Sequence, residues 1–350
     1  MGVNWDGLRI NVFFSCESTL QHYNTTMMRV NTSFYKSIVT GKDQCARTPD
    51  GMFDMFECLF GYKKEEWFDV CPPLPSVDGL NAQWKSPAFC NPPFKDMRLW
   101  FDKAVHEQRI HGVFTLMLLP FRTAARYMHH HVLQKRAVSR VVVLTSRVRF
   151  KTYKKDFPLP IVLICVGSPK AFIPMDRGIA IHSIDAILVS FVKARISMQL
   201  DAIELFKSVY NFQHVFNASS GMMMHMLAPT AIICISSSLT HDVDNVVKHL
   251  KNNDEIDYVL LLIPSLFNGT AFRTLLPYIS CIYLISPQVS LNAEEIEKKS
   301  FIGTSAVLVH HPSKPSPQPS LESIPGNVVF HRMASCNEID FAVQDSLQIR

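Results

Sequence analysis

Short apolar segments that end at Pro or in a polar turn constrain the fold most strongly, because they alternate with segments of helical periodicity. Apolar residues recur about every 3.6 positions in a helix and form short continuous runs in a buried strand. The predicted strands are 67–71, 88–90, 113–119, 141–145, 160–166, 231–235, 258–263, 281–285 and 305–309, and the predicted helices are 95–107, 123–134, 241–251 and 271–278. This alternation is typical of an α/β fold with a largely parallel sheet.

The two halves of the 350-residue chain repeat the same order of strands and helices. Two landmarks recur at one spacing, since the same number of residues separates Cys90 from Cys234 and Pro120 from Pro264. We interpret this as an internal duplication whose second copy is degenerate. The alternative is that two unrelated α/β domains share strand–helix alternation, because the identical residues are few.

Four parts are expected along the chain. An N-terminal extension covers residues 1–44, a first α/β domain covers 45–195 and a second covers 196–311. Residues 312–350 form a C-terminal tail that opens with a Pro- and Ser-rich segment. Such a composition is typical of an exposed tail or linker.

The composition favours a globular chain without a membrane span. Hydrophobic residues make up 47% and charged residues 19%, which allows a substantial core. The apolar runs are far shorter than the roughly 18–20 residues that cross a bilayer. The nine cysteines are scattered without CxxC spacing, which indicates free thiols in a reducing compartment. We therefore expect an intracellular protein of the nucleus, cytoplasm or an organelle matrix, not a secreted one.

The histidine run offers no metal site. His129, His130 and His131 lie on a predicted helix, where consecutive side chains point about 100° apart and cannot converge on one ion. No metal is expected elsewhere in the chain.

The formal net charge of +5 is unevenly distributed. No acidic residue lies between Glu107 and Asp156, whereas basic residues accumulate there. Such a block attracts a phosphate backbone, because each neutralised phosphate releases condensed counterions. The predicted nucleic-acid-binding residues are Arg122, Arg126, Arg147, Arg149, Lys151 and Lys154. Arg122 and Arg126 lie one helical turn apart, and Arg147 and Arg149 alternate along a predicted strand, 147–150, so that both point to the same face. The alternative is an ordinary solvated basic face.

A tetrapeptide with specific chemistry, Asn91-Pro92-Pro93-Phe94, directly follows the predicted strand 88–90. The exocyclic amine of adenine is a poor nucleophile, so a site must bind its N–H groups while charge develops on nitrogen. The Asn91 side-chain oxygen and the Pro92 carbonyl can both accept from that amine. Proline fixes the backbone, and the aromatic ring of Phe94 can stack on a base rotated out of its helix.

This tetrapeptide belongs to a longer ordered series of motifs. The series comprises Thr48-Pro49, Phe53-Asp54, Phe68-Asp69-Val70-Cys71, Asp78-Gly79-Leu80, Trp84, Cys90 to Phe94, Trp100, Lys103-Ala104, Leu118-Leu119-Pro120, Arg122-Thr123, Arg126, Arg147 to Phe150 and Phe157-Pro158. In order and spacing it resembles the phage-type DNA N6-adenine methyltransferases, over residues 45–170.

The resemblance implies a Rossmann-like sheet that binds S-adenosylmethionine. Asn91 to Phe94 would be the catalytic motif, with Thr48, Pro49, Asp69 and Asp78 beside the cofactor. DNA is favoured over RNA as the substrate because the family acts on DNA. For both aspartates the alternative is a turn or a helix cap. The chain departs from the family before Thr48 and at Pro72-Pro73, which puts the cofactor contacts in doubt.

Two hypotheses about function remain. The first is an active methyltransferase. The second is a catalytically silent subunit that binds RNA or protein within a larger ribonucleoprotein assembly. Ile235-Ser236-Ser237-Ser238 stands where the second copy would carry the Asn-Pro-Pro-Phe motif. The second half is therefore expected to lack catalytic capacity and to pack against the first half or bind a protein partner.

Overall fold

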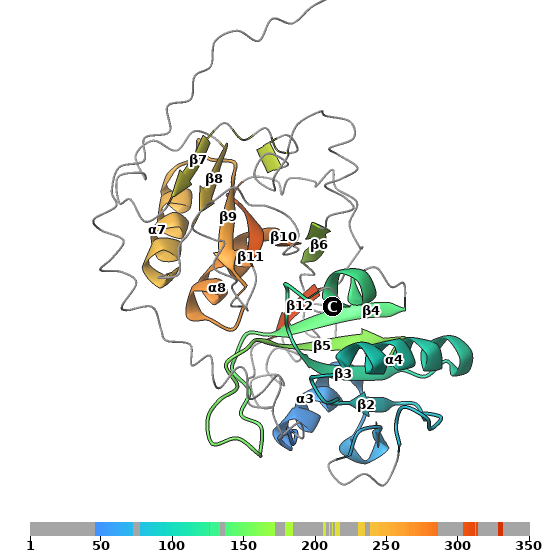
Figure 1. The fold of residues 1–350 in the computed structure, drawn as a ribbon. Coiled ribbons are helices and arrows are strands. Elements are labelled where there is room, and N and C mark those ends of the chain that lie inside the picture. Colours follow the sequence, from blue (N-terminus) through green and yellow to red (C-terminus); the bar gives the residue numbers. More distant parts are fainter. Residues whose placement is uncertain are drawn as a thin grey trace, which may run out of the picture.

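The computed structural model describes residues 46–72, 78–125, 127–133, 137–171, 179–184, 206–207, 210, 212, 214–217, 230–234, 239–265, 267–285, 304–311, 313 and 328–331. They form a mixed α/β structure with two sheets, each accompanied by helices (Figure 1).

The first sheet contains parallel and antiparallel strands. Its order is β1 (Phe68–Asp69), β2 (Ala88–Cys90), β3 (Thr115–Pro120), β5 (Ile161–Val166), β4 (Val138–Leu144) and β12 (Val328–His331). β1, β2 and β3 are parallel, and β12 is parallel to β4. β5 is antiparallel to both of its neighbours, so the sheet is mixed, with β5 running against the common direction of the other five strands.

The second sheet has the same arrangement of directions. Its order is β7 (His214–Asn217), β8 (Thr230–Cys234), β9 (Tyr258–Pro264), β11 (Thr304–His310), β10 (Ile279–Ile285) and β6 (Ala180–Ile184). β7, β8 and β9 are parallel, β11 is antiparallel to both neighbours, and β6 is parallel to β10.

The last strand of each sheet comes from outside the expected domain. β6 lies before residue 195, yet it pairs with β10 of the second sheet. β12 lies in the expected tail, yet it pairs with β4 of the first sheet in the register Val328–Val141 to His331–Leu144. The expected boundaries at 195 and 311 therefore do not match the sheets, and residues 328–331 form a strand.

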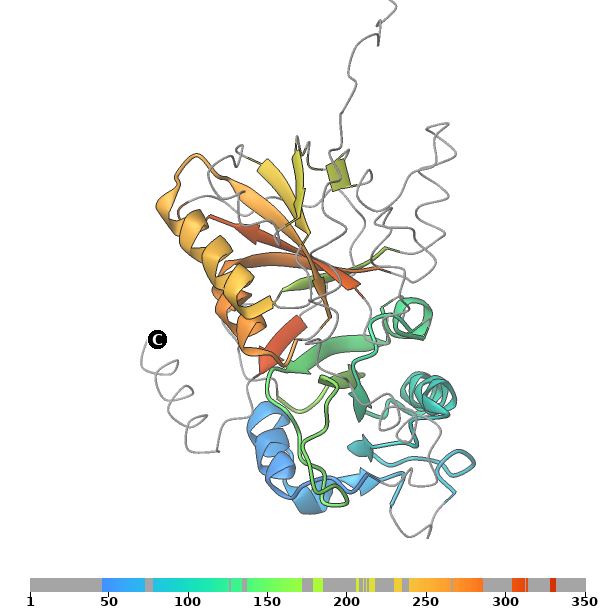
Figure 2. The same cartoon turned by 60° about the vertical axis from the view of Figure 1, so that its left-hand side comes forward.

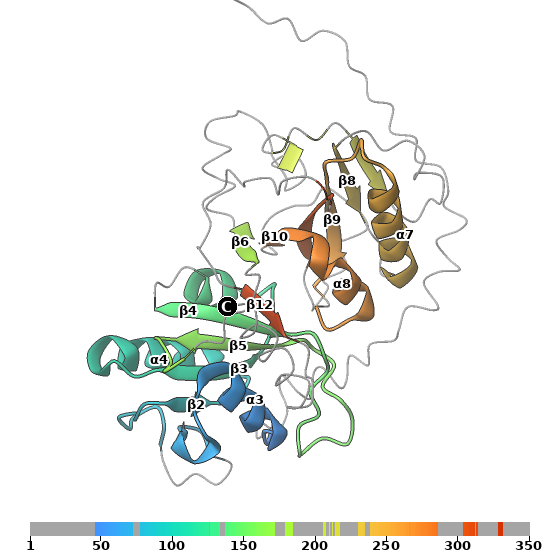
Figure 3. The same ribbon diagram turned by 180° about the vertical axis from the view of Figure 1, so that it is seen from behind.

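Helices pack on the faces of the sheets. In the first half these are α3 (Gly51–Phe60), the short η1 (Lys64–Glu66), α4 (Met97–His111) and η2 (Met128–Val132). α3 and α4 lie on opposite sides of the first sheet (Figure 2). In the second half α7 (Leu239–Asn252) is followed by α8 (Thr270–Leu275) and η3 (Leu276–Tyr278), and seen from behind α7 and α8 lie beside the second sheet (Figure 3).

Local sequence explains the central elements. Every residue of β5 is buried, as its unbroken apolar sequence predicts for a strand covered on both faces. In α4 the predicted apolar face is confirmed, because Met97, Trp100, Phe101, Ala104 and Val105 are all buried. α4 ends at Gly112, whose φ of 66° is the left-handed conformation that glycine adopts without strain.

Some predicted elements differ. The strands agree to within a few residues, but the described part of 123–134 contains only the one π-helical turn η2. The His129 ring nitrogen Nε2 lies 2.7 Å from the Thr123 carbonyl oxygen and holds that segment in a compact turn. α3, β6, β7 and β12 were not predicted.

The two halves touch where β3 and β9 end. The ring of Phe121, just after β3, lies 5.2 Å from the ring of Phe267, which follows β9. Asn268 Nδ2 donates a hydrogen bond of 3.4 Å to the Pro158 carbonyl. Within the described ranges no helix is long and apolar enough to cross a membrane.

Candidate functional site

Asn91, at the carboxyl end of β2, has a fixed side chain. Its Nδ2 donates to the Ala46 carbonyl at 2.5 Å and to Thr48 Oγ1 at 3.1 Å. Because one acceptor is a carbonyl oxygen, the amide orientation is determined and Oδ1 faces away from these partners. Among the described residues, Oδ1 has no donor. The half-buried Asn91 therefore offers one aligned acceptor.

The predicted cofactor residues Thr48 and Pro49 lie beside this motif. Thr48 contacts Asn91 across 43 positions of sequence. The Pro49 carbonyl accepts a hydrogen bond of 3.1 Å from the Met52 N–H and so starts α3. The segment before α3 is thus joined to the end of β2, and the two predicted motifs are in contact.

The rest of the tetrapeptide combines a carbonyl without a hydrogen-bond donor, that of the buried Pro92, with a covered ring. The Pro93 carbonyl accepts from the Asp96 N–H at 3.2 Å, whereas no described donor reaches the Pro92 carbonyl. Phe94 is only 4% exposed, and its ring lies 5.8 Å from that of Phe157 at 62°. Stacking of a base on Phe94 stays a prediction that requires this ring to be uncovered.

Asp69 ends β1, next to β2, in the position expected of a cofactor acceptor. Its Oδ1 accepts from the Cys71 N–H at 3.0 Å, and no described donor reaches Oδ2. Burial raises the pKa of the Asp69 carboxyl, and the Cys71 hydrogen bond opposes this only in part. The turn role and an open acceptor oxygen therefore coexist in one side chain.

Asp78 forms a turn of its own. Its two oxygens accept from the Leu80 N–H at 3.2 Å and from Asn81 Nδ2 at 2.7 Å. This turn explains Asp78 without a ligand, as the alternative interpretation expected. The turn still lies over the end of β1, because a Cβ on Gly79 would come within 2.0 Å of the Val70 carbonyl.

The predicted basic residues are not equivalent. Arg147 and Arg149 are exposed while Val148 between them is buried, so both face outward as predicted. They lie in an irregular segment after β4 and not on a strand. Arg149 Nε is 2.7 Å from Asp156 Oδ1, whereas the exposed Lys154 has no described partner.

Arg122 and Arg126 contribute less to an open basic face. Arg122 follows β3 in a half-buried position, and burial lowers the pKa of its guanidinium. Arg126 lies outside the described residues, so the predicted pairing of these arginines on one helical turn is not tested.

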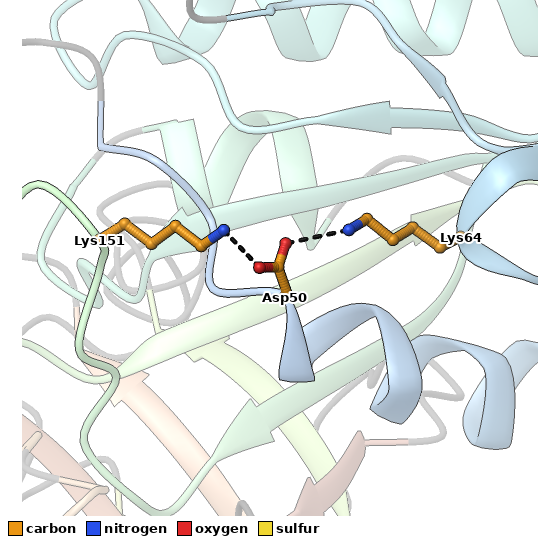
Figure 4. A network of polar contacts seen from close by, with 3 residues as sticks. All are labelled: Asp50, Lys64 and Lys151. Atoms are coloured by element: carbon orange, nitrogen blue, oxygen red, sulfur yellow. Dashed lines mark hydrogen bonds and ion pairs between the residues drawn. The ribbon is translucent and has the colours of Figure 1, made fainter.

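Lys151 takes part in a contact that the sequence did not predict. Asp50 Oδ2 lies 2.5 Å from Lys151 Nζ, and Asp50 Oδ1 lies 3.0 Å from Lys64 Nζ (Figure 4). The hydrogen bonds from Lys151 and then Lys64 lower the pKa of Asp50. The Lys151 N–H also donates to the Arg47 carbonyl at 2.9 Å. The basic segment is thereby attached to the segment that carries Thr48.

In the described part of the chain, no three His, Cys, Asp or Glu side chains cluster as they would around a metal ion. His131 Nδ1 lies 3.2 Å from Asp102 Oδ1, whereas His129 Nε2 lies 2.7 Å from the Thr123 carbonyl oxygen, so the two rings have different partners. A shallow depression of about 270 Å³ lies at the opposite, amino end of β3. Its lining residues are Gln108, Arg109, Ala137, Ser139, Gly167 and Ser168, and none belongs to the predicted site.

Comparison with family models, with curated protein sequences and with solved structures found no match to this chain.

Proposed function

We propose that the first half transfers a methyl group from S-adenosylmethionine to the N6 amine of adenine in nucleic acid. One observation carries the proposal: both N–H groups of the Asn91 amide are occupied by Ala46 and Thr48, which leaves Oδ1 as an acceptor, and the carbonyl of the following residue, the buried Pro92, accepts no hydrogen bond from the described residues. Two fixed acceptors at one loop suit a group with two N–H donors.

The chemistry requires acceptors that are in place before reaction. As the amine nitrogen attacks, positive charge develops on it, and the two oxygens stabilise that charge without reorganising. S-adenosylmethionine would supply the methyl group and leave as a neutral thioether, and the methylated amine would release one proton to solvent. Asp69, with an open oxygen and a half-buried carboxyl, fits the amino or hydroxyl groups of S-adenosylmethionine.

DNA is the favoured substrate, with RNA as the other class of nucleic acid. The exposed cations Arg147 and Lys154 lie on the loop that packs on Phe94 through Phe157. A phosphate backbone along this loop would place a base near Asn91. The support for DNA is the resemblance of the motif series.

We also propose that each half is a Rossmann-like methyltransferase sheet and that the halves arose by duplication. The two sheets have the same strand order and the same directions throughout. If Cys90 and Cys234, the last residues of β2 and β8, are equivalent, then Asp69 corresponds in register to Phe216. Loss of this acid agrees with a second copy that has no catalytic role.

The test is replacement of Asn91 by Ala. We expect methyl transfer to fall at least about a hundredfold, because a preorganised acceptor is lost. The control is Asn253→Ala, which removes an asparagine that caps a turn of the second half by accepting from the Glu255 N–H. Both variants should unfold cooperatively. Unchanged methylation by Asn91→Ala, measured with labelled methyl donor, refutes the mechanism.

The second candidate function is a silent nucleic-acid-binding subunit. The observation that favours it is the burial of Phe94 beneath Phe157, which closes the predicted base site. Calorimetric titration with S-adenosylmethionine separates the two. Binding that is lost in Asp69→Ala supports the enzyme, and absence of binding supports the silent subunit.

A further inference from the structure

The segment between β4 and β5, residues 145–160, forms a basic loop whose outward and inward sides differ in polarity. The outward side chains are charged, and the inward ones are apolar. The exposed cations are Arg147, Arg149, Lys151, Lys154 and Lys155, and the buried apolar residues are Val148, Phe150, Phe157 and Leu159.

The apolar side of the basic loop covers the aromatic residue of the catalytic motif. Phe157 lies edge-on to Phe94, Phe150 lies 5.5 Å from Phe157, and Tyr153 lies 6.1 Å from Phe150. Phe94 is thereby sealed, although Asn91 keeps a free acceptor three positions earlier. The amine-binding part of the motif is ready, and the base-stacking part is occupied by the protein's own ring.

The basic loop is held by bonds within itself, by contacts with the rest of the fold and by its buried apolar side. Within it, the Phe157 N–H donates to the Val148 carbonyl at 2.7 Å, and Arg149 pairs with Asp156. Its polar contacts with the rest of the fold include the exposed pair of Lys151 with Asp50, a backbone bond from Lys151 to Arg47 and, at its end, the bond of 2.7 Å from the Phe121 N–H to the Pro160 carbonyl. Asn268 of the second half donates to the Pro158 carbonyl at 3.4 Å. Exposed ion pairs stabilise little, so the burial of its apolar side chains contributes most to holding the loop in place.

Nucleic acid is the ligand whose chemistry matches both the charged and the apolar side of the basic loop. Arg147, Lys154 and Lys155 have no ion-pair partner among the described residues and are free to bind phosphate. An unpaired base presents a flat ring that can replace an aromatic side chain. A basic surface above a buried aromatic ring thus provides two of the groups that bind single-stranded nucleic acid.

We propose that the basic loop is a cover that nucleic acid opens: phosphates bind its charged side, and the target adenine displaces Phe157 from Phe94. This inference rests on the proposed function, since it describes how that site admits its substrate. In the free protein Phe157 excludes water from Phe94. In the complex the adenine ring takes over this contact while its amine reaches Asn91.

Hydrogen–deuterium exchange of the full chain tests the cover directly. The probe is a pyrimidine-rich single-stranded DNA with one adenine, and its control carries an abasic site at that position. We expect peptides that contain the Lys151 and Phe157 amides to exchange faster with the adenine probe than with the abasic one, while α4 is unchanged. Equal or slower exchange overturns the proposal, because a simple basic face would only become protected.

A pair of matched variants tests the role of the ring. Phe157→Leu keeps the site apolar but removes the ring, and we expect several-fold tighter binding of the adenine probe relative to the abasic probe. Phe150→Leu changes the same cluster at a residue that contacts Phe157 and Tyr153 but not Phe94. It should leave that ratio unchanged. An equal effect of both variants overturns the cover.

The exchange and binding experiments test the opening of the basic loop separately from methyl transfer. Loop opening without any methyl transfer supports the cover and counts against the enzyme. Methyl transfer without loop opening supports the enzyme and overturns the cover. If Phe157→Leu does not fold, the exchange measurement on the unchanged chain still decides.

Discussion

At the scale of single residues, Asp69 combines a cost to stability with a proposed use. Burial raises the pKa of its carboxyl, so ionisation of Asp69 is less favourable in the folded state than in the unfolded chain. The penalty is present above the folded pKa and disappears as the pH falls below the unfolded pKa. Asp69→Asn should therefore raise the melting temperature at neutral pH, but not in acid, and should weaken binding of S-adenosylmethionine.

Thermal unfolding as a function of pH checks this prediction. Asp78→Asn is the control, because the Asp78 side chain is exposed and holds a similar turn. If Asp69→Asn lowers the melting temperature at neutral pH, the carboxylate is a structural group whose charge is needed. The cofactor role would then lose its physical basis.

Glu107 is a buried carboxylate that joins α4 to the preceding loop. Its oxygens accept from Lys103 Nζ at 2.5 Å and from the Trp84 N–H at 3.3 Å. Glu107→Ala leaves a largely covered ammonium and a buried amide without partners, so we expect a loss of about 2–4 kcal/mol in the free energy of unfolding. Chemical denaturation measures it, with the exposed Glu65→Ala as control. A loss within error of the control would contradict this assignment.

At the scale of elements, the turn that carries Gly79 tests how tightly the predicted cofactor loop is packed. A Cβ at Gly79 would lie 2.0 Å from the Val70 carbonyl and 2.8 Å from the Trp100 ring. The backbone must then shift, and overpacking of this kind costs about 1–3 kcal/mol. We expect Gly79→Ala to destabilise the chain by that amount and to weaken cofactor binding, because the displaced turn lies over the end of β1, where Asp69 is.

The control for Gly79→Ala is Gly51→Ala. Gly51 is the first residue of α3, and a Cβ there would meet nothing within 4 Å. We expect a change close to zero or a gain of a few tenths of a kcal/mol. Urea denaturation and calorimetric titration of both variants check the pair. Equal behaviour of the two would mean that the turn over β1 is not closely packed.

The strands and the helix α4 could be predicted because each depends on a local apolar pattern. β2, β5 and the buried face of α4 are examples. The segment 147–150 was predicted as a strand from its alternation, yet the Phe157 N–H bonds back to Val148 and the segment finds no neighbouring strand. The alternation of charged and apolar residues predicts which side chains are buried, but not whether the backbone pairs with a neighbouring strand.

The contacts that assemble the site could not be read from local patterns. Asn91 with Thr48 and Lys151 with Asp50 join residues 43 and 101 positions apart. The motif series indicated which residues belong to one site, but not which atoms meet. That Asn91 uses its amide nitrogen and keeps its oxygen free follows only from the three-dimensional arrangement.

At the scale of the whole molecule, the exchange of β6 and β12 is the main departure from the expected organisation. Each edge strand pairs parallel with a strand that is distant in sequence, and such pairing leaves no periodic signature. Two independent domains would each supply all of their strands. The exchange makes each sheet depend on the other half, which predicts that the halves do not fold separately.

Two truncated chains test this dependence with little change in composition. A chain that ends at residue 326 lacks β12, and one that ends at 335 keeps it. Without β12 the N–H and C=O groups along one side of β4 become an open edge, which promotes aggregation. We expect the shorter chain to be less soluble and to melt several degrees lower. Equal melting temperatures would contradict a structural role for β12.

Separate expression of residues 1–195 and 196–350 extends the test to both sheets. The first piece carries β6 but lacks β12, and the second carries β12 but lacks β6. Each piece therefore has one unpaired sheet edge and one strand without its sheet. We expect both to be poorly soluble alone and to form a soluble one-to-one complex when expressed together, because the exchanged strands then find β10 and β4. A first piece that melts cooperatively by itself, at the temperature of the full chain, would show that the halves are independent domains.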